Sequence, residues 1–295
     1  PPLPCDSTGA TGPIAVTTRW GPGHRGRRAP VPDDQFEGLT VEVRDDGVGY
    51  VLFNRPEKFN ALTAQTLGVL ARALYALGER EDCGAVVISG VGPAFCAGMD
   101  LGGANLNAEG QDPVLLVYTA MRDAVTCVLA IREIPQPVIA AVKGPAVGGG
   151  FAIATACDIR ICSPDVAFMS PFVKLGVSIG DMGLSWMLPR LIGVGAAAEV
   201  FYTGKTLGAE DSRARGLVEH VVDDPLQTAG ELAAKIASRP RLAVRMSKEL
   251  LNASIAAGGL REHLELEMRS QVIGLMSQDH RKALKDFAAR NRGPQ

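Results

Sequence analysis

Short β-type runs alternate with helical stretches through the middle of this 295-residue chain. Parallel strands of one sheet must be joined by crossover connections, which are usually helices, so this alternation predicts a layered α/β fold. After Asp224 the apolar spacing becomes wholly helical, and we expect a helical layer to follow the α/β core. The expected strands are residues 40–43, 49–53, 85–88, 138–142, 158–162 and 218–222, and the first two expected helices are residues 63–81 and 112–132.

Composition divides the chain into three parts. Residues 1–36 are rich in Pro, Gly, Thr and Arg and lack apolar periodicity, which is typical of a flexible tail. We expect residues 37–225 to form the α/β core. Residues 226–295 should form a helical region that buries one face against the core or a neighbouring subunit. Within the core, Thr63 and Asp112 are expected to be helix N-caps, the second because Pro113 follows it.

Charge and apolar run lengths exclude several classes of protein. Thirty basic and thirty-two acidic residues leave a formal net charge of −2, which is unlike a nucleic-acid-binding domain. Apolar runs such as residues 138–142 and 148–156 are too short to cross a bilayer, so we expect a cytoplasmic protein without membrane contact. The six cysteines and four histidines show no zinc-binding spacing, and no metal is expected.

Two glycine-rich segments each follow an expected strand and lead toward a helix. They are residues 92–101 (GPAFCAGMDL) and 143–152 (KGPAVGGGFA). Small residues at such a junction expose free N–H groups at a helix N-terminus, where negative charge is stabilised. Two such donors converging on one oxygen would form an oxyanion hole, whereas one glycine run alone more often makes a tight turn or close packing.

Other glycine-loop interpretations fail on spacing. Residues 204–206 end like a phosphate-binding loop, but Glu199 stands where the upstream glycine is required. The run 148–150 lacks the third glycine of a dinucleotide-binding loop, because that position is Ile153. Residues 183–187 lack the final glycine of a serine-hydrolase elbow.

An ordered series of motifs runs through the chain: NRPEKFNAL (54–62), FCAGMDL (95–101), PQPVIAAV (135–142), GGG (148–150), CDIR (157–160), LPRLIG (188–193) and YTG (202–204). This series resembles the crotonase superfamily, the enoyl-CoA hydratase/isomerase family, and the similarity covers about residues 39–290. The resemblance implies a crotonase-like α/β fold of repeated β-β-α units with a C-terminal helical trimerisation region, and assembly as a homotrimer or homohexamer. It also implies a coenzyme A thioester as substrate, with no bound cofactor.

The resemblance also implies roles for single residues. The backbone N–H groups of Met99 and Gly149 match the two oxyanion-hole donors of the family. The residues expected along coenzyme A are Lys58, Asn60, Ala61 and Leu62, with Cys96 and Ala97 near the adenine. The residues expected to shape the acyl pocket are Phe172, Val173 and Trp186, for each of which burial in the plain core is an equal interpretation.

The acid/base residues depart from the family pattern. The two glutamates that handle water in hydratases would fall at Ala152 and Phe172, and neither residue can transfer a proton. Asp181 lies on a loop that resembles the family's active-site loop, and a partly buried aspartate could act as a general base. It could equally cap a helix beginning near Met182. Asp100 is expected to cap a helix.

We therefore expect an acyl-CoA-processing enzyme that stabilises a thioester enolate. Double-bond isomerisation or hydration of an enoyl-CoA, with Asp181 as the acid/base, is the leading hypothesis. The alternative from another class is a CoA-thioester-binding protein that has lost its chemistry. Decarboxylation or thioester hydrolysis on the same oxyanion hole also stays open, because function follows from site residues rather than from the fold.

Overall fold

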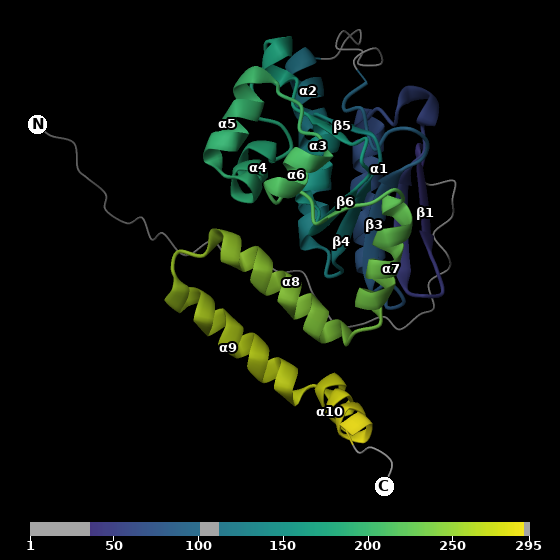
Figure 1. The fold of residues 1–295 in the computed structure, drawn as a ribbon, viewed down its shortest axis with the longest axis vertical. Helices are drawn as coiled ribbons and strands as arrows, with labels where there is room; N and C mark the ends of the chain where they lie inside the picture. Colours follow the sequence, from purple (N-terminus) through teal and green to yellow (C-terminus); the bar gives the residue numbers. More distant parts are fainter. Residues whose placement is uncertain (1–35, 101–111, 292–295) are drawn as a thin grey trace, which may run out of the picture. The chain divides into compact units, whose positions relative to one another are not determined.

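The computed structural model describes residues 36–100 and 112–291. The expected tail at residues 1–36 lies outside this range except for its last residue. One sheet has the strand order β1-β2-β3-β4-β6-β8, in which β1 and β2 are antiparallel and the other neighbours are parallel (Figure 1). The strands are β1 (Leu39–Val43), β2 (Val48–Phe53), β3 (Ala85–Gly90), β4 (Val138–Val142), β6 (Ile159–Cys162) and β8 (His220–Val221).

The predicted α/β class is confirmed, and each expected strand is present. The strand expected at residues 218–222 shortens to the two residues of β8. A second sheet was not expected: β5 (Pro145–Val147) pairs in parallel with β7 (Ala167–Met169). Each of these strands has only three residues, which is too short to show the alternation from which strands are predicted.

Helices cover both faces of the large sheet. Val86 and Ile88 of β3 pack into one apolar cluster, while Ala85 and Val87 pack into another, because successive strand side chains point to opposite faces. The first cluster contains residues of α1 (Ala64–Gly78), α2 (Pro113–Glu133) and α3 (Gly149–Ala156). The second is completed by α7 (Pro225–Ala237), which lies across the strands (Figure 1). All five residues of β4 are buried as a result.

The two helix starts predicted from caps are confirmed. The Thr63 side chain accepts a hydrogen bond from the backbone N–H of Thr66 at 3.0 Å, and α1 begins at Ala64. The Asp112 carboxylate accepts one from the N–H of Val114 at 2.9 Å, and α2 begins at the following proline. Each cap satisfies an N–H that has no acceptor within its own helix.

The helix α2 corrects one expectation from the sequence. Its segment Val114–Glu133 is long and apolar enough to cross a membrane by length and composition, so the statement that the apolar runs are too short was wrong. Polar residues within this helix divide it into short uninterrupted apolar runs, so a search for such runs passes over it. In the structure α2 packs against α1 and α3 and keeps an exposed apolar outer face, which includes Leu115, Tyr118, Val125 and Leu129.

A buried lysine anchors the C-terminal helices to the core. Lys248 of α8 (Arg241–Ala256) is only 4% exposed. Its Nζ lies 2.8 Å from the carbonyl oxygens of Ile131 and Gln136 and 3.0 Å from Oδ2 of Asp158. Asp158 also accepts a hydrogen bond from the N–H of Val138 at 2.8 Å, so one carboxylate links α8 to the start of β4.

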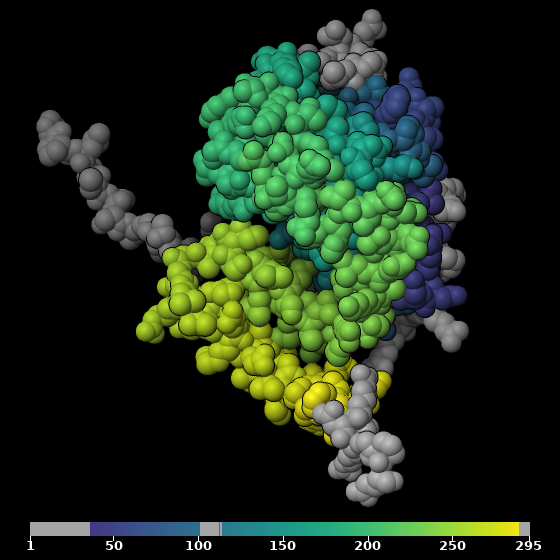
Figure 2. Space-filling view, viewed as in Figure 1, coloured from purple at the N-terminus to yellow at the C-terminus, as the bar shows by residue number. Residues whose placement is uncertain are grey.

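The next helix has little of its surface covered. No residue of α9 (Leu260–Met276) is buried, and Figure 2 shows the C-terminal helices (yellow-green to yellow) open to solvent along much of their length. The final described helix is α10 (Gln278–Asn291). The exposed large apolar residues of α9 are Leu260, Leu264, Leu266, Met268, Val272, Ile273, Leu275 and Met276.

Every cysteine in the described ranges is buried as a free thiol. Burial raises the pKa of the Cys96 thiol to about 12 and that of Cys83 to about 11. These thiols are therefore protonated near neutral pH and are poor nucleophiles. The five residues are Cys83, Cys96, Cys127, Cys157 and Cys162.

Candidate active site

The two glycine-rich turns lie against each other. Cys96 and Ala146 form a parallel bridge, in which the N–H of Cys96 donates to the oxygen of Pro145 and the N–H of Val147 donates to the oxygen of Cys96. A Cβ built on Gly98 would lie 2.8 Å from the oxygen of Val147 and 3.8 Å from the nitrogen of Gly149. The residue that precedes Met99 is therefore beside the Gly149 amide.

The backbone leaves both predicted donors unused. Leu62 bridges to Met99 through the oxygen of Gly98 and the N–H of Asp100, so the N–H of Met99 points to the other side of its segment. Gly149 is the first residue of α3, where an N–H has no intrahelical acceptor. Neither amide donates a hydrogen bond to any residue that the structure describes. Both can hold an oxyanion.

A side chain at the Gly149 position would press on two neighbouring side chains. A Cβ built there would lie 3.1 Å from Cδ1 of Leu62 and 3.1 Å from Sδ of Met182. The preceding Gly148 has φ +51°, and its Cβ would lie 3.5 Å from the Phe172 ring. Phe172, in the 3₁₀ turn η3 (Phe172–Leu175), thus places an apolar ring beside the oxyanion turn.

Neither position expected for a family glutamate carries an acid. Ala152 is fully buried on α3, and Phe172 is half-buried on its turn. Asp181 is the acid on the loop that follows η3. The next residue, Met182, lies against Gly149. Burial raises the pKa of the Asp181 carboxyl, which disfavours its charged form.

The helix-cap interpretation of Asp181 is wrong. The helix α4 (Leu184–Ile192) begins two residues later than expected, and its N-cap is Gly183, without a side-chain hydrogen bond. Met182 and Gly183 both have positive φ, which turns the chain away before the helix starts. The Asp181 carboxyl neither accepts a hydrogen bond nor pairs with a cation within the described residues. It is free for chemistry.

Asp100 forms an ion pair within the described residues. Its Oδ2 lies 3.3 Å from Nη2 of Arg55, and this ion pair joins the 54–62 turn to the first glycine-rich turn. The helix that Asp100 was expected to cap would lie in residues 101–111, outside the described residues.

The residues expected along coenzyme A differ in what their side chains can offer. Lys58 is exposed at the end of the short turn η2 (Pro56–Lys58), while Ala61 and Ala97 are half-buried. The side chains of Leu62 and Cys96 are fully buried. Contact with coenzyme A at these last two positions therefore falls to the backbone, and the set as a whole stays a prediction.

Asn60 has a structural function that the sequence did not reveal. It is 1% exposed, and its Oδ1 accepts from the N–H of Arg55 at 2.9 Å. Its Nδ2 donates to the oxygens of Val91 and Ala94 at 2.9 and 2.8 Å. This side chain thus fixes the 54–62 turn against the loop that leads into the first glycine-rich turn.

Two of the expected acyl-pocket residues are exposed. Val173 is 38% exposed and Trp186 is 52% exposed, so burial in the core does not explain them. The Arg190 guanidinium lies 3.3 Å from the centroid of the Trp186 ring, a cation–π contact that restrains the ring. Their predicted role in the acyl pocket stays open to test.

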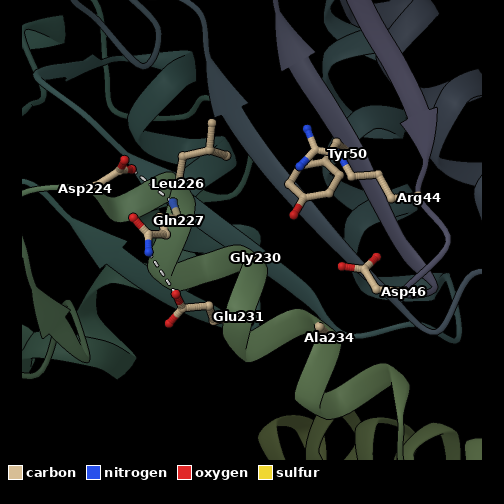
Figure 3. A pocket seen from close by; sticks show the side chains of 9 residues that line it. All are labelled: Arg44, Asp46, Tyr50, Asp224, Leu226, Gln227, Gly230, Glu231 and Ala234. Carbon is tan, nitrogen blue, oxygen red and sulfur yellow. Dashed lines mark hydrogen bonds between the residues drawn. The ribbon is translucent and has the colours of Figure 1, made fainter.

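A separate hollow of about 470 Å³ lies between β1–β2 and α7 (Figure 3). None of its lining residues belongs to the glycine-rich turns. The Arg44 guanidinium covers the Tyr50 ring at 4.0 Å. Asp224 caps α7 through the N–H of Gln227, and Glu231 accepts from the side chain of Gln227. Because these polar groups are already paired in this way, the hollow is no candidate active site.

The fold is a mostly parallel α/β core, and its two adjoining glycine-rich turns leave the amides of Met99 and Gly149 without a partner among the described residues. The sequence profile of the enoyl-CoA hydratase/isomerase family matches residues 43–294. The chain belongs to this family, whose members act on coenzyme A thioesters.

Individual relatives cover most of the chain. EchA14 of Mycobacterium tuberculosis is 35% identical over 258 residues, which are 87% of this chain and 96% of that protein. The 1,2-epoxyphenylacetyl-CoA isomerase of Escherichia coli is 33% identical over 253 residues, 85% of this chain and 95% of its own. The crystal structure of enoyl-CoA hydratase from Bacillus anthracis superposes with a TM-score of 0.80 at 32% identity, covering 88% of this chain and 98% of that one.

Proposed function

We propose that this enzyme shifts the double bond of an enoyl-CoA, with Asp181 carrying the proton. The observation that carries the proposal is one half-buried, unpaired carboxyl next in the chain to Met182, which lies against Gly149, with Ala152 and Phe172 at the positions of the missing glutamates. Hydration requires acid and base groups that hold and split a water molecule. Isomerisation requires one group that removes a proton and returns it elsewhere.

The proposed steps balance with a single carboxylate. Asp181 takes a proton from C2 of a 3-enoyl-CoA, and the electron pair moves toward the thioester oxygen to give a dienolate. The amides of Met99 and Gly149 hold that oxygen, and such donors stabilise the transition state more than the ground state. Asp181 then returns the proton to C4, which yields the 2-enoyl thioester and restores the carboxylate.

Proton exchange in D₂O tests this proposal. Purified enzyme is incubated with saturated, 2-enoyl and 3-enoyl CoA thioesters, and deuterium uptake and products are followed by mass spectrometry. We expect deuterium uptake and double-bond migration with wild type and with the exposed-residue control Asp211→Asn, but not with Asp181→Asn. Water addition that survives in Asp181→Asn would overturn the proposal, and bound thioester without exchange in wild type would favour a binding protein.

We also propose that a neighbouring copy of this chain covers α9, in a trimer or a pair of trimers. A helix of this length with no buried residue is marginal by itself, and its exposed leucines, isoleucine and methionines are costly in water. Light scattering should give a multiple of the 31.0 kDa chain mass. Leu264→Glu should dissociate the assembly, while Glu265→Gln should leave it intact; a monomeric wild type would refute the assembly.

A further inference from the structure

Met182 has an unusual backbone conformation for its residue type. Its φ is +48°, and the following Gly183 has φ +74°. Left-handed φ is uncommon outside glycine and a few short polar residues, and it costs on the order of 1–3 kcal/mol that the surroundings must offset. Such residues concentrate at active sites, where they hold a neighbouring group in a required direction.

The surroundings hold Met182 through its side chain. Met182 is 3% exposed, although it lies on a loop between η3 and α4. Its Sδ would lie 3.1 Å from a Cβ on Gly149, so it packs directly on the Cα of an oxyanion-hole residue. The N–H of Asp181 donates to the oxygen of Ile179 at 2.8 Å, and the oxygen of Asp181 accepts from Leu184 at 3.1 Å. The aspartate backbone is thereby fixed on both sides of its peptide.

We propose that Met182 is a positioning residue for the reaction: its side chain seats the Asp181 loop on the Gly149 turn, and its left-handed backbone directs the Asp181 carboxyl. The proposal rests on the function proposed above, in which Asp181 moves the proton. One residue then couples the two parts of the site. The oxyanion amide and the proton carrier keep a fixed separation because Met182 packs against Gly149 and directly follows Asp181 in the chain.

The two halves of this proposal are separable by substitution. Met182→Leu keeps an unbranched Cβ and a similar apolar volume, so it should retain most of the activity. Met182→Ala removes the contact with Gly149, and a misplaced catalytic group costs on the order of 10²-fold in rate. Met182→Val keeps apolar bulk, but a β-branched residue is strongly disfavoured at this φ, so it should also lose activity.

The measurement is the rate of double-bond migration as a function of substrate concentration and pH. We expect kcat of Met182→Ala to fall on the order of 10²-fold while KM changes by less than about threefold, because substrate binding is retained. The rising limb of its pH–rate profile should also move to lower pH, since water that reaches the Asp181 carboxyl lowers its pKa toward the ordinary value. Leu188→Ala removes a fully buried side chain of α4 and is the matched control for general loosening.

The outcomes distinguish this proposal from the one on which it rests. If Met182→Ala kept the kcat and the pH midpoint of the wild type while Asp181→Asn was inactive, the role of Met182 would be overturned and the proposed function would stand. Equal losses in Met182→Ala and Leu188→Ala would also overturn that role, because any loosened core would then suffice. Full activity in Asp181→Asn would instead refute the proposed function. If Met182→Ala fails to fold, the contrast between Met182→Leu and Met182→Val decides the matter.

Discussion

A Cβ built on Gly150 would lie 2.5 Å from the carbonyl oxygen of Cys96, a distance that real Cβ atoms essentially never show. The two glycine-rich turns therefore meet backbone to backbone at this point. Their separation is set by the main chain rather than by side chains, which are soft and can rotate. The paired amides of Met99 and Gly149 inherit that fixed geometry.

Gly150→Ala should consequently damage both stability and rate. The added methyl group must push apart two backbone segments, which typically costs about 1–3 kcal/mol of unfolding free energy. Displacing one oxyanion donor should lower kcat on the order of 10² to 10³-fold. Chemical denaturation and turnover assays check these values. The control is Gly195→Ala on α5 (Val194–Thr203), where a Cβ meets no atom within 4 Å. It should lower neither the stability nor kcat.

Asp181→Asn should stabilise the protein at neutral pH while abolishing proton transfer. Because burial raises the pKa of Asp181 in the folded state, the charged carboxylate opposes folding once the pH exceeds the unfolded-state pKa. The stabilising contribution of the protonated form is present at low pH and is lost as pH rises through the folded pKa. Thermal melts should show a higher Tm for Asp181→Asn at pH 7 and no difference near pH 3. A lower Tm at pH 7 would contradict this.

The wild-type pH–rate profile should also show the raised pKa of Asp181. A general base must be unprotonated, so the rate should rise through a carboxyl pKa above the ordinary aspartate range. Initial rates between pH 4 and pH 8 measure this midpoint. A midpoint at or below the ordinary range would assign proton transfer to another group.

Lys248→Met should loosen the C-terminal helices. Lys248→Met removes one of the two cations that pair with Asp158 and leaves Arg132 as the other, so the expected cost is about 1–3 kcal/mol. Here the change also strips a donor from the carbonyls of Ile131 and Gln136. Denaturant unfolding and light scattering should report lower stability and a weakened assembly. The exposed Lys235→Met on α7 is the control, and it should stay within about 0.5 kcal/mol of wild type.

Asn60→Ala should weaken the support of the 54–62 turn, which is predicted to bind coenzyme A. The change leaves the buried carbonyl of Ala94 without its donor, and such a loss costs about 1–3 kcal/mol. We expect a raised KM for CoA thioesters with a smaller change in kcat, measured by steady-state kinetics. Asn54→Ala, which removes an exposed hydrogen bond to Thr40, should leave KM unchanged. An unchanged KM in Asn60→Ala would separate the turn from substrate binding.

Local signals in the sequence predicted local structure well. Thr63 and Asp112 cap their helices as expected, because a cap depends on residues within one turn. The positions of Met99 and Gly149 followed from ordered motifs, and the structure leaves both amides unused. Structural features that depend on packing between distant segments were not predicted. One is the left-handed φ of Met182, a residue type that does not signal this conformation, and another is the N-cap of α4 at Gly183 rather than at Asp181. The same holds for Asn60, whose Nδ2 donates to the oxygens of Val91 and Ala94, 31 and 34 residues away.

The five buried thiols can report how often the segments around them open in the native protein. They are Cys83, Cys96, Cys127, Cys157 and Cys162. An alkylating reagent can mark these positions only during the moments when their strand, turn or helix comes apart. Cys5, the sixth cysteine, lies outside the described residues. Mass mapping of the marks over time would therefore rank the segments of the core by how often each one opens, with no label introduced by mutation.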